Sequence, residues 1–81
     1  MLVIEIIGWT GSALILTAYA LLSIGKLAAR SSLYQLMNIL GALGMAINGW
    51  AHGAFPSVAN NLIWAVIGGV ALVRLLTARR A

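Results

Sequence analysis

The chain has 81 residues, of which 63% are hydrophobic and only 7% are charged, whereas about 25% of the residues of an ordinary soluble domain carry a charge. The sequence contains no cysteine, and Glu5 is its only carboxylate side chain. This composition excludes a soluble globular domain, a disordered chain and a disulfide scaffold, because so few charges cannot cover a hydrated surface. The sequence predicts an all-α integral membrane protein.

The first predicted helix covers residues 2–24, an apolar run interrupted by Glu5 and small hydroxyl residues. A membrane-spanning helix needs about 20 largely apolar residues, because the hydrocarbon core is about 30 Å thick. A basic turn from Gly25 to Arg30 follows, and Ser31 or Ser32 can cap the next helix. We therefore expect residues 2–24 to cross the membrane once.

Two further spans are predicted at residues 32–51 and 57–76. Pro56 disfavours helix at Phe55 and favours a new helical start after it. The two connections are short, so consecutive helices should be antiparallel neighbours. Residues 1–81 are therefore expected to form one domain of three transmembrane helices.

The orientation of the spans follows from the basic residues. With three spans, the first connection and the C-terminal tail lie on one side of the membrane. All five basic residues fall there: Lys26, Arg30, Arg74, Arg79 and Arg80. The positive-inside rule then places the C-terminus in the cytoplasm and the N-terminus outside. Because these cations flank apolar runs and do not form a solvated patch, no nucleic-acid partner is expected.

Polar residues recur at helical spacing inside each predicted span, and a polar side chain in lipid needs a partner in the protein or in water. The second span carries such a stripe, whose members lie within about 40° of one line: Tyr34, Asn38, Gly41, Met45, Asn48 and His52. The first span has Glu5, Trp9, Ser12, Leu16, Tyr19 and Ser23, and the third has Asn60, Trp64, Ile67, Ala71 and Arg74. All three stripes are expected to point into the protein.

Small residues in the spans predict where helices approach closely. The expected packing positions are Gly8, Ser12, Gly41, Gly44, Gly68 and Gly69. The asparagines at positions 38, 48, 60 and 61 have two open interpretations. They either hold helices together through hydrogen bonds, at about 0.6 to 2 kcal/mol per contact, or line a binding site.

The inventory of reactive side chains argues against an enzyme. With no Cys, no Asp, one Glu and one His, one copy cannot supply a carboxylate pair, a catalytic triad or a complete zinc site. Glu5 and His52 are expected at the same outer surface. They are interpreted as an interfacial carboxylate and a loop histidine, although a symmetric dimer would supply two of each. Neither a cofactor nor a metal is expected.

Several short motifs accompany this three-span layout: residues 7–9, Ala18-Tyr19, residues 31–34, and His52-Gly53 followed by Pro56 and Asn60-Asn61. With these motifs the sequence resembles the bacterial SemiSWEET sugar transporters of the PQ-loop superfamily, and equally a set of small permease-like three-span bacterial proteins. The family's Pro-Gln pair is absent near Leu21-Leu22. The resemblance implies a multi-pass protein of the bacterial inner membrane.

Two functions remain open from the sequence. The first is a homodimeric transporter of a small, polar, uncharged solute, with a midplane site lined by Asn38, Asn48, Asn61 and Trp64. The second is a non-catalytic accessory subunit of a larger membrane assembly, such as a respiratory or photosynthetic complex. In that case the amides and glycines would pack against partner helices.

Overall fold

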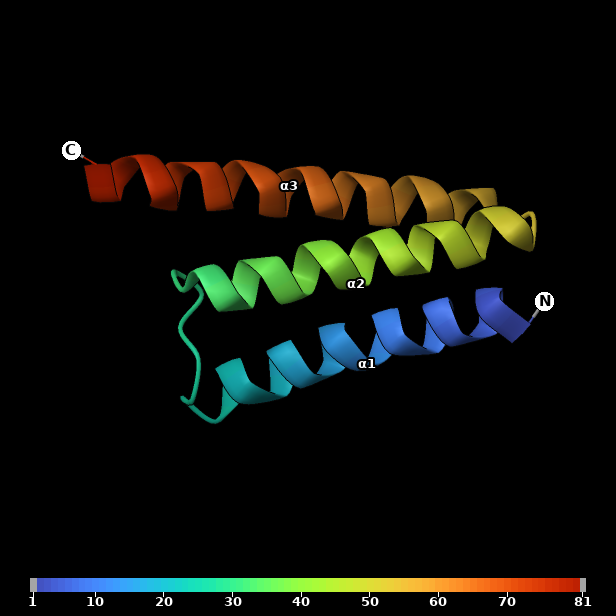
Figure 1. The fold of residues 1–81 in the computed structure, drawn as a ribbon, viewed down its shortest axis with the longest axis horizontal. Coiled ribbons are helices and arrows are strands. Elements are labelled where there is room, and N and C mark those ends of the chain that lie inside the picture. Colours follow the sequence, from blue (N-terminus) through green and yellow to red (C-terminus); the bar gives the residue numbers. More distant parts are fainter. Residues whose placement is uncertain (1, 81) are drawn as a thin grey trace.

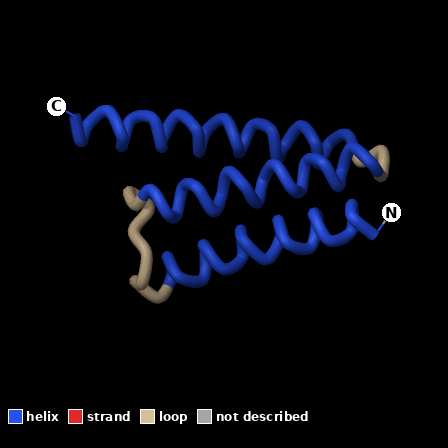
Figure 2. The backbone as a smooth tube through the Cα atoms, in the orientation of Figure 1, coloured by secondary structure: helices blue, strands red, loops and turns tan. Residues whose placement is uncertain are grey.

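The computed structural model describes the backbone of residues 2–80 and the side chains of residues 2–78. Over these residues the chain is all-helical, with α1 at Leu2–Ser23, α2 at Ser32–Ala51 and α3 at Phe55–Arg80. Consecutive helices run antiparallel, joined by a longer loop after α1 and a tight turn after α2 (Figures 1 and 2). The prediction of three helices in one chain is thus confirmed.

Local sequence signals explain where the helices end. Ser31 is the N-cap of α2, and its hydroxyl accepts a hydrogen bond from the Tyr34 amide at 3.0 Å. Gly25 and Gly53 follow α1 and α2 with φ values of 79° and 69°, a left-handed conformation that glycine adopts at little cost. In each case the next residue donates back to the carbonyl five positions earlier, at 2.8 Å for both Lys26 and Ala54. Both helices therefore end in a Schellman motif.

The third helix is longer than predicted. It begins at Phe55 and continues to Arg80, whereas the sequence predicted residues 57–76. Pro56 lies inside the first turn of the helix, where its missing amide hydrogen costs nothing because that group has no helical partner anyway. The expectation that helix starts only after Pro56 was therefore wrong by two residues.

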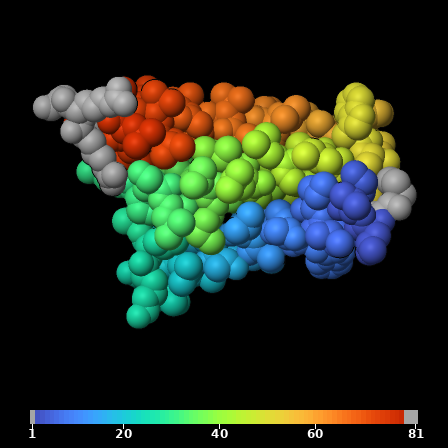
Figure 3. Space-filling view, viewed as in Figure 1, coloured from blue at the N-terminus to red at the C-terminus, as the bar shows by residue number. Residues whose placement is uncertain are grey.

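The three helices form a single layer with α2 in the middle (Figure 1). α1 packs on one side of α2 and α3 on the other, and among the described residues α1 and α3 do not touch. In the space-filling view, the surface of α2 forms a band between those of α1 and α3 (Figure 3). Every interhelical interface in the described chain therefore involves α2.

The interior of this layer consists of small residues. The buried hydrophobic side chains are Ala18, Ala42 and Ala46, and no large side chain of the described residues is fully buried. Large apolar side chains point outward instead, among them Leu2, Ile63 and Val66, which are each more than 60% exposed. This distribution is the reverse of that in a soluble domain, whose large apolar residues lie inside.

Two of the helices are long and apolar enough to cross a membrane. They are Leu2–Ser23 and Phe55–Ala78, with mean hydropathies of 1.6 and 1.8. Helix α2 is not among them, although its 20 residues suffice in length. Its amides and glycines lower its hydropathy, so of the three predicted spans the one at residues 32–51 does not pass the same test.

Candidate functional site

A hollow lies between α1 and α2, near the N-terminus of α1 and the C-terminus of α2. It has a volume of about 260 Å³ and is lined by Glu5, Gly8, Trp9, Ser12, Met45 and Asn48. We call it the outer hollow. It combines a carboxylate, a hydroxyl, an amide and an indole, and it is the place where the polar positions of α1 and α2 meet.

Asn48 connects the two helices at the outer hollow. Its Nδ2 donates to the Ile4 carbonyl at 3.0 Å. The side chain lies directly over Gly8, because a Cβ added at Gly8 would lie 2.4 Å from the Asn48 Nδ2. Gly8 is thus required for Asn48 to reach the backbone of α1, and this bond joins residues 44 positions apart.

Glu5 and His52 form a pair at the rim of this hollow. The His52 Nε2 lies 3.2 Å from the Glu5 Oε1, and both side chains are about half exposed. The His52 Nδ1 lies 2.8 Å from the Asn48 carbonyl oxygen, which can only accept, so Nδ1 carries a hydrogen. With Nδ1 engaged in this way, Nε2 is the ring nitrogen that faces the Glu5 carboxyl group.

A second hollow, which we call the inner hollow, lies between α2 and α3. Its volume is about 190 Å³, and it is lined by Tyr34, Gln35, Asn38, Trp64, Ile67, Gly68 and Ala71. Asn38 is buried, and its Nδ2 donates to the Tyr34 carbonyl at 2.9 Å. The Trp64 Nε1 donates to the Asn38 Oδ1 at 3.4 Å. This polar contact joins α2 to α3.

The four predicted site residues are divided among three places. Asn48 lies in the outer hollow, and Asn38 and Trp64 share the inner hollow. Asn61 lines neither, and its Nδ2 donates to the Ser57 carbonyl of its own helix at 2.9 Å. Asn38 and Asn48 contact different helices because the ten residues of helix between them rotate one from the other by about 80°. With a neighbour on each side of α2, this rotation turns Asn38 toward α3 and Asn48 toward α1.

The polar stripe of α1 borders α2 only at the outer hollow, and most of it is exposed. Trp9, Leu16 and Tyr19 are 74%, 65% and 64% exposed, and the buried side of α1 that packs on α2 carries Gly8, Gly11 and Ala18 instead. The expectation that the whole stripe points inward was therefore wrong within one copy. In a layer of three helices an outer helix has only one covered side, and here the smallest residues occupy it.

Glycines bring α1 and α2 into backbone contact. A Cβ at Gly41 would lie 2.8 Å from the Gly11 carbonyl oxygen, and one at Gly44 would lie 3.0 Å from the Ile7 carbonyl oxygen. Gly11 was missed by the sequence analysis. The signal was present, since Gly8 and Gly11 repeat the spacing of Gly41 and Gly44.

The other predicted packing positions behave differently. Gly68 is close to α2, because a Cβ there would lie 2.9 Å from the Ile39 side chain. Around Gly69 nothing lies within 4 Å of such a Cβ, so it makes no close approach within the described chain. Ser12 lines the outer hollow. Gly49, which was not predicted, is also close to α3, because a Cβ there would lie 3.2 Å from the Val58 side chain.

The cationic positions lie at the opposite end from the Glu5–His52 pair. Lys26 and Arg30 belong to the loop after α1, and Arg74 is exposed near the C-terminal end of α3. The side chains of Arg79 and Arg80 lie outside the described residues. Among residues 2–78, no group of three or more His, Cys, Asp or Glu side chains is placed to hold a metal ion.

Comparison with known proteins gives a match to a family model. Residues 4–80 match it, so the match includes almost the whole of α1 and all of α2 and α3. No curated protein and no solved structure matches the chain.

Proposed function

We propose that this chain, which over residues 4–80 belongs to the family whose model it matches, is a small integral membrane protein that crosses the bilayer three times. It acts as a homodimer that transports a small, polar, uncharged solute. The resemblance of the sequence to SemiSWEET transporters supports this proposal, and the outer hollow is the observation that carries it.

The distribution of apolar surface supports lipid as the surrounding solvent. In the most apolar stretches of α1 and α3, only 17% and 6% of the residues are buried within the protein. The core helices of a soluble domain would be mostly buried. Small residues inside and large apolar residues outside suit lipid, because helices in a bilayer associate through close packing and not through the hydrophobic effect.

Helix α2 crosses as the middle span despite its lower hydropathy. Its 20 residues extend about 30 Å, which equals the thickness of the hydrocarbon core. Its polar side chains are not left to the lipid, since Asn38 is buried against α3 and Asn48 bonds to α1. The apolar helices on either side of it shield these groups.

The charges support one orientation. The loop after α1 and the C-terminal end of α3 lie at the same end of the layer (Figure 1). Every basic residue of the sequence belongs to that end, and Glu5 and His52 lie at the other. The positive-inside rule places the basic end in the cytoplasm of a bacterial inner membrane.

The outer hollow supports a solute site at an interface between two copies. If the outer hollow faced the acyl chains of the lipid, its hydroxyl, amide and carboxylate would be left unsolvated, at a cost of several kcal/mol. At about 260 Å³ it is also smaller than the roughly 300–1,000 Å³ of typical small-molecule sites. Two such hollows facing each other reach that range. Because the lining offers a hydroxyl, an amide and an indole as neutral hydrogen-bonding groups, the combined site favours an uncharged polar solute.

Cross-linking tests the dimer. The sequence has no cysteine, so a single Ser12→Cys substitution in the outer hollow reports contact between copies. We expect oxidation in native membranes to give a disulfide-linked dimer for Ser12→Cys and little for Val73→Cys, which is exposed on α3. Equal cross-linking at both positions, or none at Ser12→Cys, contradicts the proposed interface.

Uptake tests the transport itself. Proteoliposomes containing the protein are assayed with radiolabelled glucose, sucrose and glycerol, each against empty liposomes. Ser12→Leu fills the outer hollow and should abolish uptake, whereas Ala13→Leu, on the exposed surface beside it, should leave uptake unchanged. A folded dimer that takes up none of the three solutes, or equal uptake by the two variants, refutes this function.

One observation favours the accessory-subunit alternative. Asn48 donates to the backbone of α1, and Asn38 accepts from Trp64 of α3, all inside one copy. Structural interhelical bonds have this form. Native electrophoresis of membranes solubilised in mild detergent separates the two functions. A discrete dimer supports transport, and comigration with a much larger complex supports the accessory role.

A further inference from the structure

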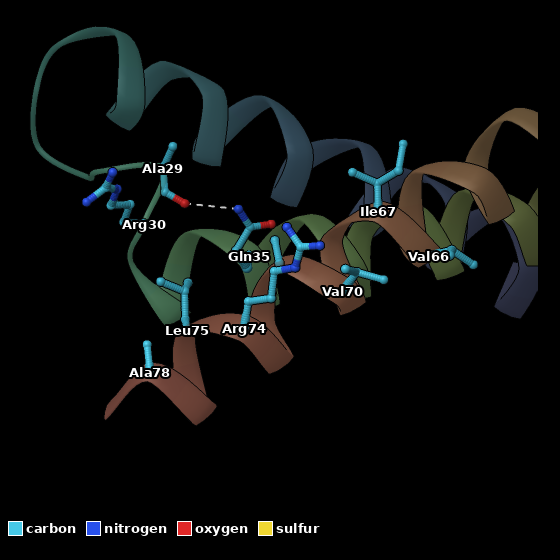
Figure 4. A pocket seen from close by; sticks show the side chains of 10 residues that line it. Ala29, Arg30, Gln35, Val66, Ile67, Val70, Arg74, Leu75 and Ala78 are labelled. Atoms are coloured by element: carbon cyan, nitrogen blue, oxygen red, sulfur yellow. Dashed lines mark hydrogen bonds between the residues drawn. The ribbon is translucent and has the colours of Figure 1, made fainter. Parts of the chain in front are cut away.

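A groove lies at the basic end of the molecule, between the loop after α1, the start of α2 and the second half of α3 (Figure 4). It has a volume of about 650 Å³ and is larger than either hollow. Arg30, Gln35 and Arg74 supply its polar lining, and Val66, Val70 and Leu75 are among the apolar side chains that line the rest. We call it the basic groove.

The start of α2 fixes the loop beside this groove. The Gln35 Nε2 donates to the Ala29 carbonyl at 2.9 Å (Figure 4). Arg30, which follows Ala29, is thereby held next to the groove. Arg74 extends from α3 over the groove, toward the side of α2 that carries Gln35 (Figure 4). Two cations from separate parts of the chain thus border one depression.

These two arginines have no carboxylate partner among the side chains of the sequence. Glu5 is the only acidic side chain, and it pairs with His52 at the other end of the layer. Within the described residues, the basic groove therefore presents two cations with no acidic side chain beside them. Guanidinium groups bind phosphate oxygens in a planar, two-pronged geometry, so a phosphate group complements this charge.

The apolar part of the groove selects a lipid over a small soluble anion. Val66 and Arg74 are eight residues apart on α3, a rise of about 12 Å. One leaflet of hydrocarbon is about 15 Å deep. A phosphate at the level of Arg74 would thus place most of one acyl chain along Val66 and Val70.

We propose that the basic groove binds an anionic phospholipid, with the phosphate at Arg74, Arg30 on the loop beside the headgroup, and one acyl chain along α3. This inference rests on the membrane location proposed above and not on transport or dimerisation. Basic pockets on the cytoplasmic side of helical membrane proteins are suited to such headgroups. A second copy is a poorer occupant, because a symmetric contact would bring the same arginines together with no carboxylate to compensate.

Native mass spectrometry from a neutral detergent tests this site with two lipids of equal chain length. We expect phosphatidylglycerol to bind at least fivefold more tightly than phosphatidylcholine. Arg74→Gln and Arg30→Gln should each weaken phosphatidylglycerol binding about fivefold, as expected for loss of one cation at a membrane surface. Lys26→Gln, at the same end but not in the groove lining, should leave binding unchanged.

A further variant tests the acyl chain. Val70→Trp fills the apolar part of the groove without changing its charge, and it should also weaken phosphatidylglycerol binding. Equal binding of the two lipids, an equal loss in Lys26→Gln, full binding by Val70→Trp, or displacement of the lipid by inorganic phosphate each overturns the proposal. A monomer without uptake activity that still binds phosphatidylglycerol selectively would contradict only the transport function.

Discussion

The crossing of α1 and α2 at Gly11 gives the sharpest test of how the helices are held together. A Cβ at Gly11 would lie 2.7 Å from the Gly41 carbonyl oxygen and 3.1 Å from the Met45 amide nitrogen. The first distance is about 0.7 Å short of ordinary contact, which begins at 3.4 Å. Both neighbours are backbone atoms, so a methyl group can be accommodated only if the helices move apart.

The Gly11→Ala variant should therefore be destabilised. Overpacking of a tight interface costs about 1–3 kcal/mol, and the intrinsic helix preference of alanine over glycine offsets about 0.5–1 kcal/mol. We expect a net loss of about 1–2 kcal/mol in the free energy of unfolding. Unfolding by SDS in mixed micelles, followed by tryptophan fluorescence, measures it.

Gly69→Ala is the matched control, because it makes the same chemical change within a helix. Nothing lies within 4 Å of the added methyl group, so only the helix preference applies and stability should rise by up to about 1 kcal/mol. If Gly11→Ala and Gly69→Ala unfold at the same SDS fraction, the close α1–α2 crossing is wrong.

Three further variants test single polar contacts. Asn48→Ala removes the bond from α2 to the backbone of α1 and should lower the unfolding free energy by about 0.6–2 kcal/mol in the same SDS titration. Trp64→Phe removes the donor to Asn38, and because that contact is long at 3.4 Å, thermal unfolding in detergent should show a loss of about 0.5–1 kcal/mol. Glu5→Gln weakens an exposed pair with His52, so stability at low salt should fall by less than about 1 kcal/mol, and less still at high salt.

Controls make these outcomes decisive. Asn60 is an exposed asparagine on α3, and Asn60→Ala should change stability by less than about 0.5 kcal/mol. If it costs as much as Asn48→Ala, the interhelical bond has no special weight. If Glu5→Gln lowers the free energy of unfolding by more than about 2 kcal/mol, the Glu5–His52 pair is much less exposed to solvent than the half-exposed pair of this structure.

The sequence by itself determined the helices. Composition and apolar run length predicted an all-α chain, and the predicted middle helix at residues 32–51 has the bounds of the observed one. The pair Ser31-Ser32 indicated a helix start and Gly25 a helix end, because capping depends on a few neighbouring residues. The structure selects Ser31 of the two serines as the cap. Pro56 misled, since proline is compatible with both a break and a first helical turn.

Only the tertiary structure decided which side of each helix is covered. Periodicity placed the polar residues of α1 on one line, but α2 packs instead against Gly8, Gly11 and Ala18. Periodicity also placed Asn38 and Asn48 on one face, whereas Asn48 bonds to α1 and Asn38 to α3, on opposite sides of α2. The spacing of residues fixes their angles within one helix, whereas the direction of the adjacent helix depends on how closely two backbones can approach. In this chain glycine and alanine set that approach.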